Sequence, residues 1–300
     1  MPSLSFVTVD VFTTTRFAGN PLAIVRIPKG EDVSTEQMQS VAREFNLSET
    51  VFLYESEEDA REWRFRIFIT TAELPFAGHP TIGTACYALG TLAKDASNGT
   101  LLCKAGPIGL EYSAGAAKAS IPHNVHIHGE SEFTAEQLYK SQPALEGSRL
   151  HAINIVSPVK GMNFICVELD SLEDLAKVVI SGVKPTATLD KEWDLGFVGS
   201  YFYVILGDRK SEKYEVRTRM IEGAMEDPAT GSAACGLSAF LAIDGRHPNL
   251  ALTITQGVEM GRKSDIGVDM TLKGPDYETV EKIELSGSAV KVMEGTVEYA

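Results

Sequence analysis

The chain has 300 residues, of which 44% are hydrophobic and 23% charged, an ordinary globular composition with room for two domains. Its 41 acidic and 27 basic residues give a formal net charge of -14, which would repel nucleic acid and excludes it as an expected partner. No apolar run approaches the roughly 18 residues that a membrane span needs. The four cysteines form no CxxC pair and no basic, apolar leader opens the chain, so we expect a cytoplasmic protein without disulfides or structural zinc.

Alternating hydrophobic residues organise the first part of the sequence into strands. We predict strands over residues 4–12, 21–27, 51–54 and 62–70. Ser34 is predicted to open a helix, because Gln37 stands three residues later as a capping-box partner. The helix is amphipathic, with Met38, Val41 and Phe45 on one face.

The second part of the sequence repeats this organisation. Strands are predicted over residues 151–158, 164–169, 197–206, 214–220, 251–257, 265–272, 281–287 and 289–299. Residues 171–180 are predicted to form a short helix.

Two further helices, rich in small residues, can be laid on one another. The first contains Gly78 and Gly83, the second Gly231 and Gly236, so each has two glycines five residues apart. This match indicates an internal duplication. It predicts an α+β protein of two similar halves, residues 1–120 and 121–300, each a sheet rolled around a central helix. The last strand is free to pack back on the first half.

The start of each central helix is a candidate anion site. Unpaired backbone N–H groups and the positive end of the helix dipole suit a carboxylate or a developing oxyanion. His79 stands at the first start and Asp227, Thr230 and Ser232 at the second. His79 is either a proton carrier or a plain helix-capping imidazole. Asp227 is either functional or a turn residue before Pro228.

Two other carboxylates lie near these motifs. Glu49 falls at a helix-to-strand junction between Leu47 and Val51. An apolar junction would raise its pKa and suit it to general acid–base chemistry, but the spacing fits an exposed loop carboxylate equally well. Glu226 is expected to be solvated.

A histidine cluster, His123, His126 and His128, is a weaker candidate for metal binding. His126 and His128 would face the same side of a strand, but no fourth ligand is evident nearby. We therefore expect no metal site.

Five segments together resemble the PhzF family of phenazine-biosynthesis-like isomerases. They read FAGNPLAIV, NLSETVFL, ELPFAGHPTIGTA, EDPATGSAACGL and QGVEMGRKS, in family order and over nearly the whole chain. The resemblance implies the diaminopimelate-epimerase-like fold, with the active site in a cleft between the halves. It also implies a cytoplasmic homodimer that uses no metal or organic cofactor. The best-known member isomerises trans-2,3-dihydro-3-hydroxyanthranilate with a glutamate as proton shuttle.

The same resemblance implies roles for individual residues. The shuttle would be Glu49, while His79 and Asp227 would hold and polarise the substrate. The implied substrate-binding set is Asn20, Ser48, Gly78, Thr230, Gly231 and Ser232. The implied partner is a small carboxylated molecule.

The sequence departs from the epimerases of this fold, which use two opposed cysteines beside the helix starts. Neither start carries a cysteine here, and Cys86 and Cys235 are not equivalently placed. We therefore expect a cofactor-independent isomerase with a single base. The alternatives are an epimerase of a related small acid and a non-catalytic binding protein that retains the cleft.

Overall fold

The computed structural model describes residues 2–56, 61–94, 96–129, 132–194, 196–209 and 211–299. The chain divides into two compact units. The N-terminal unit comprises Met1–Pro122 with Leu285–Ala300, and the C-terminal unit comprises His123–Glu284. Strands make up most of both units, and helices are few.

The N-terminal unit is a closed barrel. Its strands are β1 (Ser3–Val11), β2 (Asn20–Ile27), β3 (Thr50–Tyr54), β4 (Glu62–Phe68), β5 (Glu73–Leu74), β6 (Asn98–Cys103), β7 (Gly106–Ser113), β8 (Ala116–Ser120) and the last part of β17 (Thr279–Glu298). Pairing runs from β17 through β1, β2, β3, β4, β6, β7 and β8, and β8 pairs with β17 to close the ring. The closure leaves the strands of this ring without an open sheet edge, while the two-residue β5 pairs with β4 outside the ring.

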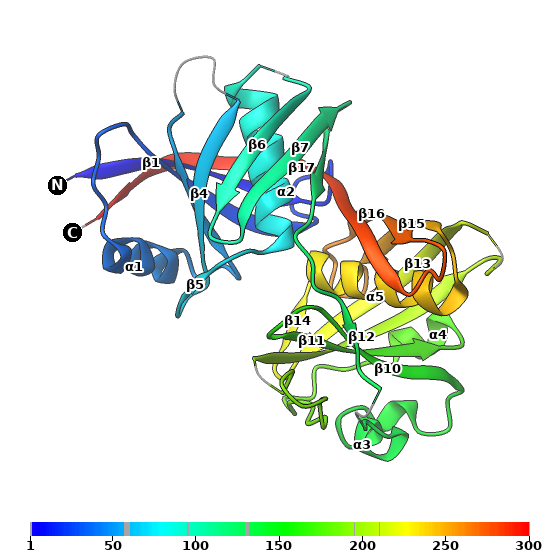
Figure 1. Cartoon of the computed structure of the whole chain (residues 1–300). Coiled ribbons are helices and arrows are strands. Elements are labelled where there is room, and N and C mark those ends of the chain that lie inside the picture. The colour runs from blue at the N-terminus through cyan, green and yellow to red at the C-terminus, as the bar shows by residue number, and fades with distance from the viewer. Residues whose placement is uncertain are drawn as a thin grey trace. The chain divides into compact units, whose positions relative to one another are not determined.

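A buried helix, α2 (Gly78–Tyr87), fills this barrel (Figure 1). All ten of its residues are buried, and it contacts β1, β2, β3, β7 and β8. Its small residues permit this closeness, since a Cβ on Gly83 would lie 2.7 Å from side-chain atoms of Leu22 and Val11. A π-helical turn, Ala88–Leu92, extends α2. The amphipathic helix α1 (Thr35–Phe45) has the predicted capping box and contacts β3 and β4 through a separate apolar cluster.

The C-terminal unit is a second sheet that packs against a buried helix, α5 (Gly231–Gly245). Its strands are β9 (His126–Ile127), β10 (Leu150–Val159), β11 (Met162–Leu169), β12 (Phe197–Leu206), β13 (Lys213–Glu222), β14 (Met225–Asp227), β15 (Asn249–Gln256) and β16 (Ser264–Lys273). They pair in the order β9, β10, β11, β12, β13, β15, β16, with β14 as a hairpin partner of β13. Helix α5 contacts β10, β11, β15 and β16.

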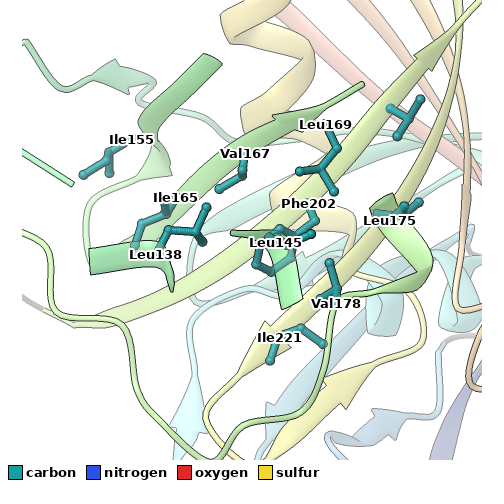
Figure 2. Packing of buried hydrophobic residues seen from close by; sticks show 11 residues of the cluster. Leu138, Leu145, Ile155, Ile165, Val167, Leu169, Leu175, Val178, Phe202 and Ile221 are labelled. Carbon is teal, nitrogen blue, oxygen red and sulfur yellow. The ribbon is translucent and has the colours of Figure 1, made fainter. Parts of the chain in front are cut away.

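Short helices α3 (Ala135–Ser141) and α4 (Leu172–Ala176), with the 3-10 turn Pro143–Leu145, contribute to a second apolar layer of this unit. Figure 2 shows the layer, in which Leu138, Leu145 and Leu175 from these segments meet side chains of the sheet. Those sheet residues are Ile155, Ile165, Val167, Leu169, Phe202, Val204 and Ile221.

Parallel strand pairs explain where α1, α2, α4 and α5 occur. A parallel pair requires a crossover connection. Helix α1 lies between the parallel strands β2 and β3, and α2 between β4 and β6. In the C-terminal unit, α4 lies between β11 and β12, and α5 between β13 and β15. Both units thus place two helices between parallel strands, and this shared order of elements favours the predicted duplication. The duplication itself stays a prediction.

Three predicted elements need adjustment. The helix predicted over 171–180 covers only Leu172–Ala176, and the chain then places Val178 in the apolar layer. The strands predicted over 281–287 and 289–299 are one strand, β17. Its Gly287 does not break the strand: a Cβ there would lie 2.3 Å from the ring of Phe12, so the glycine permits close packing. The structure also has elements outside the predicted ones, namely strands β5, β6, β7, β8 and β14 and helix α3.

Candidate active site

Glu49 and His79 come together in the N-terminal unit. Asn46, the C-cap residue after α1, takes the left-handed conformation with φ 50°, and Glu49 follows just before β3. His79 is the second residue of α2. Nδ1 of His79 lies 3.4 Å from Oε2 of Glu49, and the two side chains are 5% and 17% exposed. The carboxyl group of Glu49 is therefore largely withdrawn from solvent, while its catalytic role stays a prediction.

Burial raises the pKa of Glu49 from 4.5 to about 7, while a hydrogen bond from Ser48 acts weakly in the opposite direction. Within the described parts of the chain, Oε2 of Glu49 is shielded from water and has no hydrogen-bond partner. A carboxyl group with a pKa near 7 can both accept and return a proton at neutral pH. This is the property that a proton shuttle needs.

The start of α2 lies beside this pair. Its N-cap residue, Ala77, has no side-chain oxygen to bind the first backbone N–H groups of the helix. Gly78 is buried within the first turn, and Pro80 occupies a position where the missing N–H costs little. The N-terminus thus offers backbone donors and the positive end of the helix dipole near His79.

The other predicted residues of this unit are Asn20 and Ser48. Asn20 is buried at the start of β2, opposite Val11 of β1. Gly19 before it has φ +67°, and a Cβ there would lie 2.3 Å from the carbonyl oxygen of Val11, so only glycine fits. Ser48 is exposed, next to Glu49.

Glu73 and Arg66, which the sequence reasoning did not single out, anchor the segment that leads to α2. Arg66 on β4 donates from Nε and Nη2 to the two carboxylate oxygens of Glu73 on β5, at 2.8 and 2.7 Å. Lys104 donates to the same carboxylate at 2.6 Å. The Arg66 guanidinium, with Lys104, lowers the pKa of Glu73 below its ordinary value. The sequence could have indicated this ion pair, because Arg66 and Glu73 lie close together in one hairpin, in which Phe68 pairs with Glu73.

In the C-terminal unit, Asp227 ends β14 and Thr230 is the N-cap residue of α5. Thr230 Oγ1 donates to Oδ2 of Asp227 at 2.5 Å. Gly231 and half-buried Ser232 form the first turn of the helix. Asp227 therefore binds the side chain of the N-cap residue, and no side-chain hydrogen bond caps the helix from Thr230 itself.

Gln256, the last residue of β15, was also missed by the sequence reasoning, although it opens one of the five family-like segments. Its side chain is fully buried. Nε2 donates to the backbone carbonyl of Asp227 at 2.8 Å and to Thr230 Oγ1 at 3.0 Å, and Oε1 accepts from the backbone N–H of Thr230 at 3.3 Å. One amide thus binds the segment that carries Asp227 and Thr230.

The prediction that Glu226 is solvated is wrong. Glu226 is 7% exposed, and Arg219 donates to both of its carboxylate oxygens at 2.8 and 2.7 Å. Arg219 also donates to the carbonyl oxygens of Leu175 and Val178. Successive side chains of a strand point to opposite faces, so Glu226 faces this ion pair and Asp227 faces away from it.

Two members of the histidine cluster, His126 and His128, lie beside Asp190, a neighbour that the sequence did not reveal. His126 Nε2 lies 2.9 Å from Oδ2 of Asp190. His128 Nδ1 accepts from the backbone N–H of Asp190 at 3.1 Å, and its Nε2 lies 2.8 Å from Ser157 Oγ. Ser157 donates its own proton to Asn163, so it accepts from Nε2–H of His128. His128 is therefore a neutral imidazole with its lone pair in use, and burial lowers its pKa. It suits a structural role better than metal ligation.

Cys86 and Cys235 lie within the central helices α2 and α5, and both are buried. Burial raises the pKa of Cys86 to about 11 and of Cys235 to about 12. Both stay protonated at neutral pH and are poor bases or nucleophiles.

Comparison with known proteins identifies the relatives of this chain. The sequence profile of the phenazine biosynthesis-like protein family matches residues 9–295. An uncharacterised isomerase from Mesorhizobium japonicum is 33% identical over 98% of this chain and 99% of its own. Trans-2,3-dihydro-3-hydroxyanthranilate isomerase from Pseudomonas aeruginosa is 30% identical over 97% and 98%. The crystal structure of a PhzF-family phenazine biosynthesis protein from Bacillus anthracis superimposes with a TM-score of 0.80, at 23% identity and over 99% and 100% of the two chains. In the residues described, no helix is long and apolar enough to span a bilayer.

Proposed function

Because the chain belongs to the phenazine biosynthesis-like (PhzF) family and is an isomerase, we propose that it moves a proton within a small carboxylated substrate by single-base catalysis. The substrate would resemble trans-2,3-dihydro-3-hydroxyanthranilate, and no metal or organic cofactor would take part. The observation that carries the proposal is the buried Glu49 carboxyl group, with a pKa of about 7 and His79 at 3.4 Å.

In the proposed reaction, ionised Glu49 accepts a proton from a substrate carbon. The C–H bond breaks, its electron pair moves into the adjacent unsaturated system, and Glu49 becomes a neutral acid. Glu49 then returns the proton to another carbon and is ionised again, so the reaction consumes no other reagent. Its pKa makes both transfers accessible at neutral pH. His79, 3.4 Å from Glu49, would polarise the substrate.

The remaining predicted residues are assigned to substrate binding. The backbone at Gly78 and Gly231 would bind the substrate carboxylate, because each residue begins a buried helix. Asp227 would bind an amine or hydroxyl group, with Thr230 and Ser232 beside it. Asn20 and Ser48 complete the set. A diaminopimelate-epimerase-like pair of similar halves, a homodimer and a cytoplasmic location stay predictions.

Proton NMR in deuterium oxide tests this proposal. Trans-2,3-dihydro-3-hydroxyanthranilate and a panel of small amino and hydroxy acids would be incubated with wild type and with Glu49→Gln. We expect isomerisation or deuterium uptake at one carbon by wild type and its loss in the variant. An unchanged rate in Glu49→Gln would refute the role of Glu49.

Two other functions predict different spectra. An epimerase would invert a stereocentre, but the obvious second base, a thiol, is protonated at both Cys86 and Cys235. A non-catalytic binding protein would show ligand resonances shifting without exchange. Single-base isomerisation is favoured because the raised pKa of Glu49 serves proton transfer and has no use in binding alone.

A further inference from the structure

We propose that Gln256 is the positioning residue of the C-terminal unit, holding the Asp227 carboxylate and the start of α5 in the geometry that substrate binding needs. This inference rests on the proposed function for the role of Asp227. It adds a residue outside the set expected from the sequence. Gln256 would not touch the substrate, and it would act through Asp227 and Thr230.

The orientation of the Gln256 amide follows from its backbone partners. The backbone N–H of Thr230 can only donate, so the atom of Gln256 that faces it must be Oε1. The backbone carbonyl oxygen of Asp227 can only accept, so the atom that faces it must be Nε2. Tyr201 OH and Thr218 Oγ1 donate to Oε1 at 3.2 and 3.4 Å, which supports the same orientation.

This orientation fixes the direction of the hydrogen bonds that reach Asp227. Nε2 of Gln256 donates to Thr230 Oγ1, so the hydroxyl proton of Thr230 is left to donate to Oδ2 of Asp227. The short 2.5 Å contact is the geometry expected when a hydroxyl donates to a carboxylate. Gln256 thereby orients the side chain of Asp227 through Thr230.

The backbone contacts of Gln256 fix the start of α5 as well. Oε1 engages the amide of the N-cap residue, Thr230, whose own carbonyl accepts from Ala234 at 3.0 Å. The chain after Gln256 turns closely against the same segment. Gly257 has φ +73°, and a Cβ there would lie 2.7 Å from the carbonyl oxygen of Pro228. The amide is therefore buried at the point where β15 meets the segment from Asp227 to Thr230.

Two substitutions of Gln256 test the proposal. Gln256→Leu removes all amide hydrogen bonds, and Gln256→Glu keeps the shape but, when ionised, cannot donate to Asp227 or Thr230. Gln142→Glu is the matched control, because Gln142 is a buried glutamine whose amide both donates to and accepts from the backbone of Val179 at 2.8 Å. Thermal denaturation of all three variants checks folding.

The first measurement needs no substrate. Amide hydrogen exchange by NMR should accelerate at least about tenfold for Thr230 in Gln256→Leu, since its N–H loses an acceptor. The exchange rate of the Leu138 amide in α3, which donates to the carbonyl oxygen of Thr134, should not change. An unchanged Thr230 amide would overturn the proposal whether or not the protein acts on any compound tested.

The second measurement is the pH profile of deuterium incorporation into trans-2,3-dihydro-3-hydroxyanthranilate. At pH 8, Gln256→Glu should lose about 10²-fold in kcat/KM, because a displaced binding group costs rates of that order. The kcat/KM of the variant, divided by that of wild type, should recover about tenfold between pH 8 and pH 5.5. The reason is that the introduced carboxyl group becomes protonated and can again donate a hydrogen bond. Of the titratable groups beside this position, Asp227 shares the network, and Tyr201 stays neutral because burial raises its pKa.

The outcomes separate the two proposals. The positioning role would be overturned by a ratio of kcat/KM between Gln256→Glu and wild type that does not change with pH. An equal loss of kcat/KM in Gln142→Glu would overturn it as well, because Gln256 would then be only structural. A wild-type protein that exchanges no compound would instead contradict the proposed function, while the exchange of the Thr230 amide still shows whether Gln256 holds the segment.

Discussion

The Glu49 carboxylate meets the His79 imidazole at 3.4 Å, although the two residues are 30 positions apart in the chain. Glu49 follows α1, and His79 begins α2, which the barrel encloses. Both elements belong to β-α-β crossovers of one barrel, and this shared barrel holds the two groups together. Because the contact is buried, the proton affinity of Glu49 is set by the fold.

Replacing this carboxylate should abolish turnover with the fold intact. We expect Glu49→Gln to lower kcat by about 10²–10⁴-fold, the usual contribution of a positioned acid or base. Exchange of substrate protons in deuterium oxide provides the measurement. The control is Glu44→Gln, on the exposed face of α1, which should leave the rate unchanged. Equal effects of the two substitutions would contradict a special role for Glu49.

The pH dependence of kcat/KM should report the same carboxyl. Glu49 must be ionised to accept a proton, so activity should rise with pH through a midpoint of about 7 and fall away below it. With an ordinary exposed glutamate as the base, the rise in activity would instead have its midpoint near pH 4.5, the usual pKa of that side chain. A rate that is level from pH 5 to 8 would exclude Glu49 as the essential base of the free enzyme.

Glu49 should also cost stability at neutral pH. Its pKa is raised from 4.5 to about 7, so within this window the folded state holds a proton that the unfolded state has lost. The free energy of unfolding therefore falls as pH rises through the window, by up to about 3 kcal/mol. Glu49→Gln should remove this penalty and be more stable than wild type at pH 8 but not at pH 4. Denaturant unfolding at both pH values measures the difference.

Local signals in the sequence predict the parts of the fold that depend on neighbouring residues. The capping box of Ser34 and Gln37 involves residues three apart, and the structure confirms it. The small residues around Gly83 correctly predict a buried helix. The contacts of Glu226 and Gln256 could not be predicted in this way. The partner of Glu226 depends on the hairpin that brings β14 to β13, and Gln256 needs the end of β15 beside Asp227.

Loss of the Glu73 anchor should disturb both stability and catalysis. Glu73→Gln leaves Arg66 facing a neutral amide, and we expect a loss of about 2 kcal/mol at pH 7, typical of hydrogen bonds to charged groups. The pKa of Glu73 is lowered, so the stabilisation that its carboxylate provides is present above the ordinary glutamate pKa of 4.5 and is lost as pH falls below it. Wild type and variant should therefore converge in acid.

The exposed partner provides the control for this prediction. Lys104 is 59% exposed, so Lys104→Met should cost less than about 1 kcal/mol. Since β5 leads directly into the turn before His79, kcat/KM should fall in Glu73→Gln but not in Lys104→Met. A Glu73→Gln variant with wild-type kinetics would show that the anchor does not position α2.

Cysteine substitutions separate single-base isomerisation from a two-thiol mechanism. Cys86→Ala and Cys235→Ala should keep deuterium exchange within about threefold of wild type, because a protonated, buried thiol is a poor base. Each substitution removes one buried atom and should cost about 1 kcal/mol through the small cavity it leaves. Rates would be compared at a temperature where thermal denaturation shows both variants folded.

A loss of more than about 100-fold in the exchange rate of either variant, with inversion of a stereocentre by wild type, would favour a racemase with thiol bases. Retained exchange in both variants, together with its loss in Glu49→Gln, would leave the carboxylate as the base.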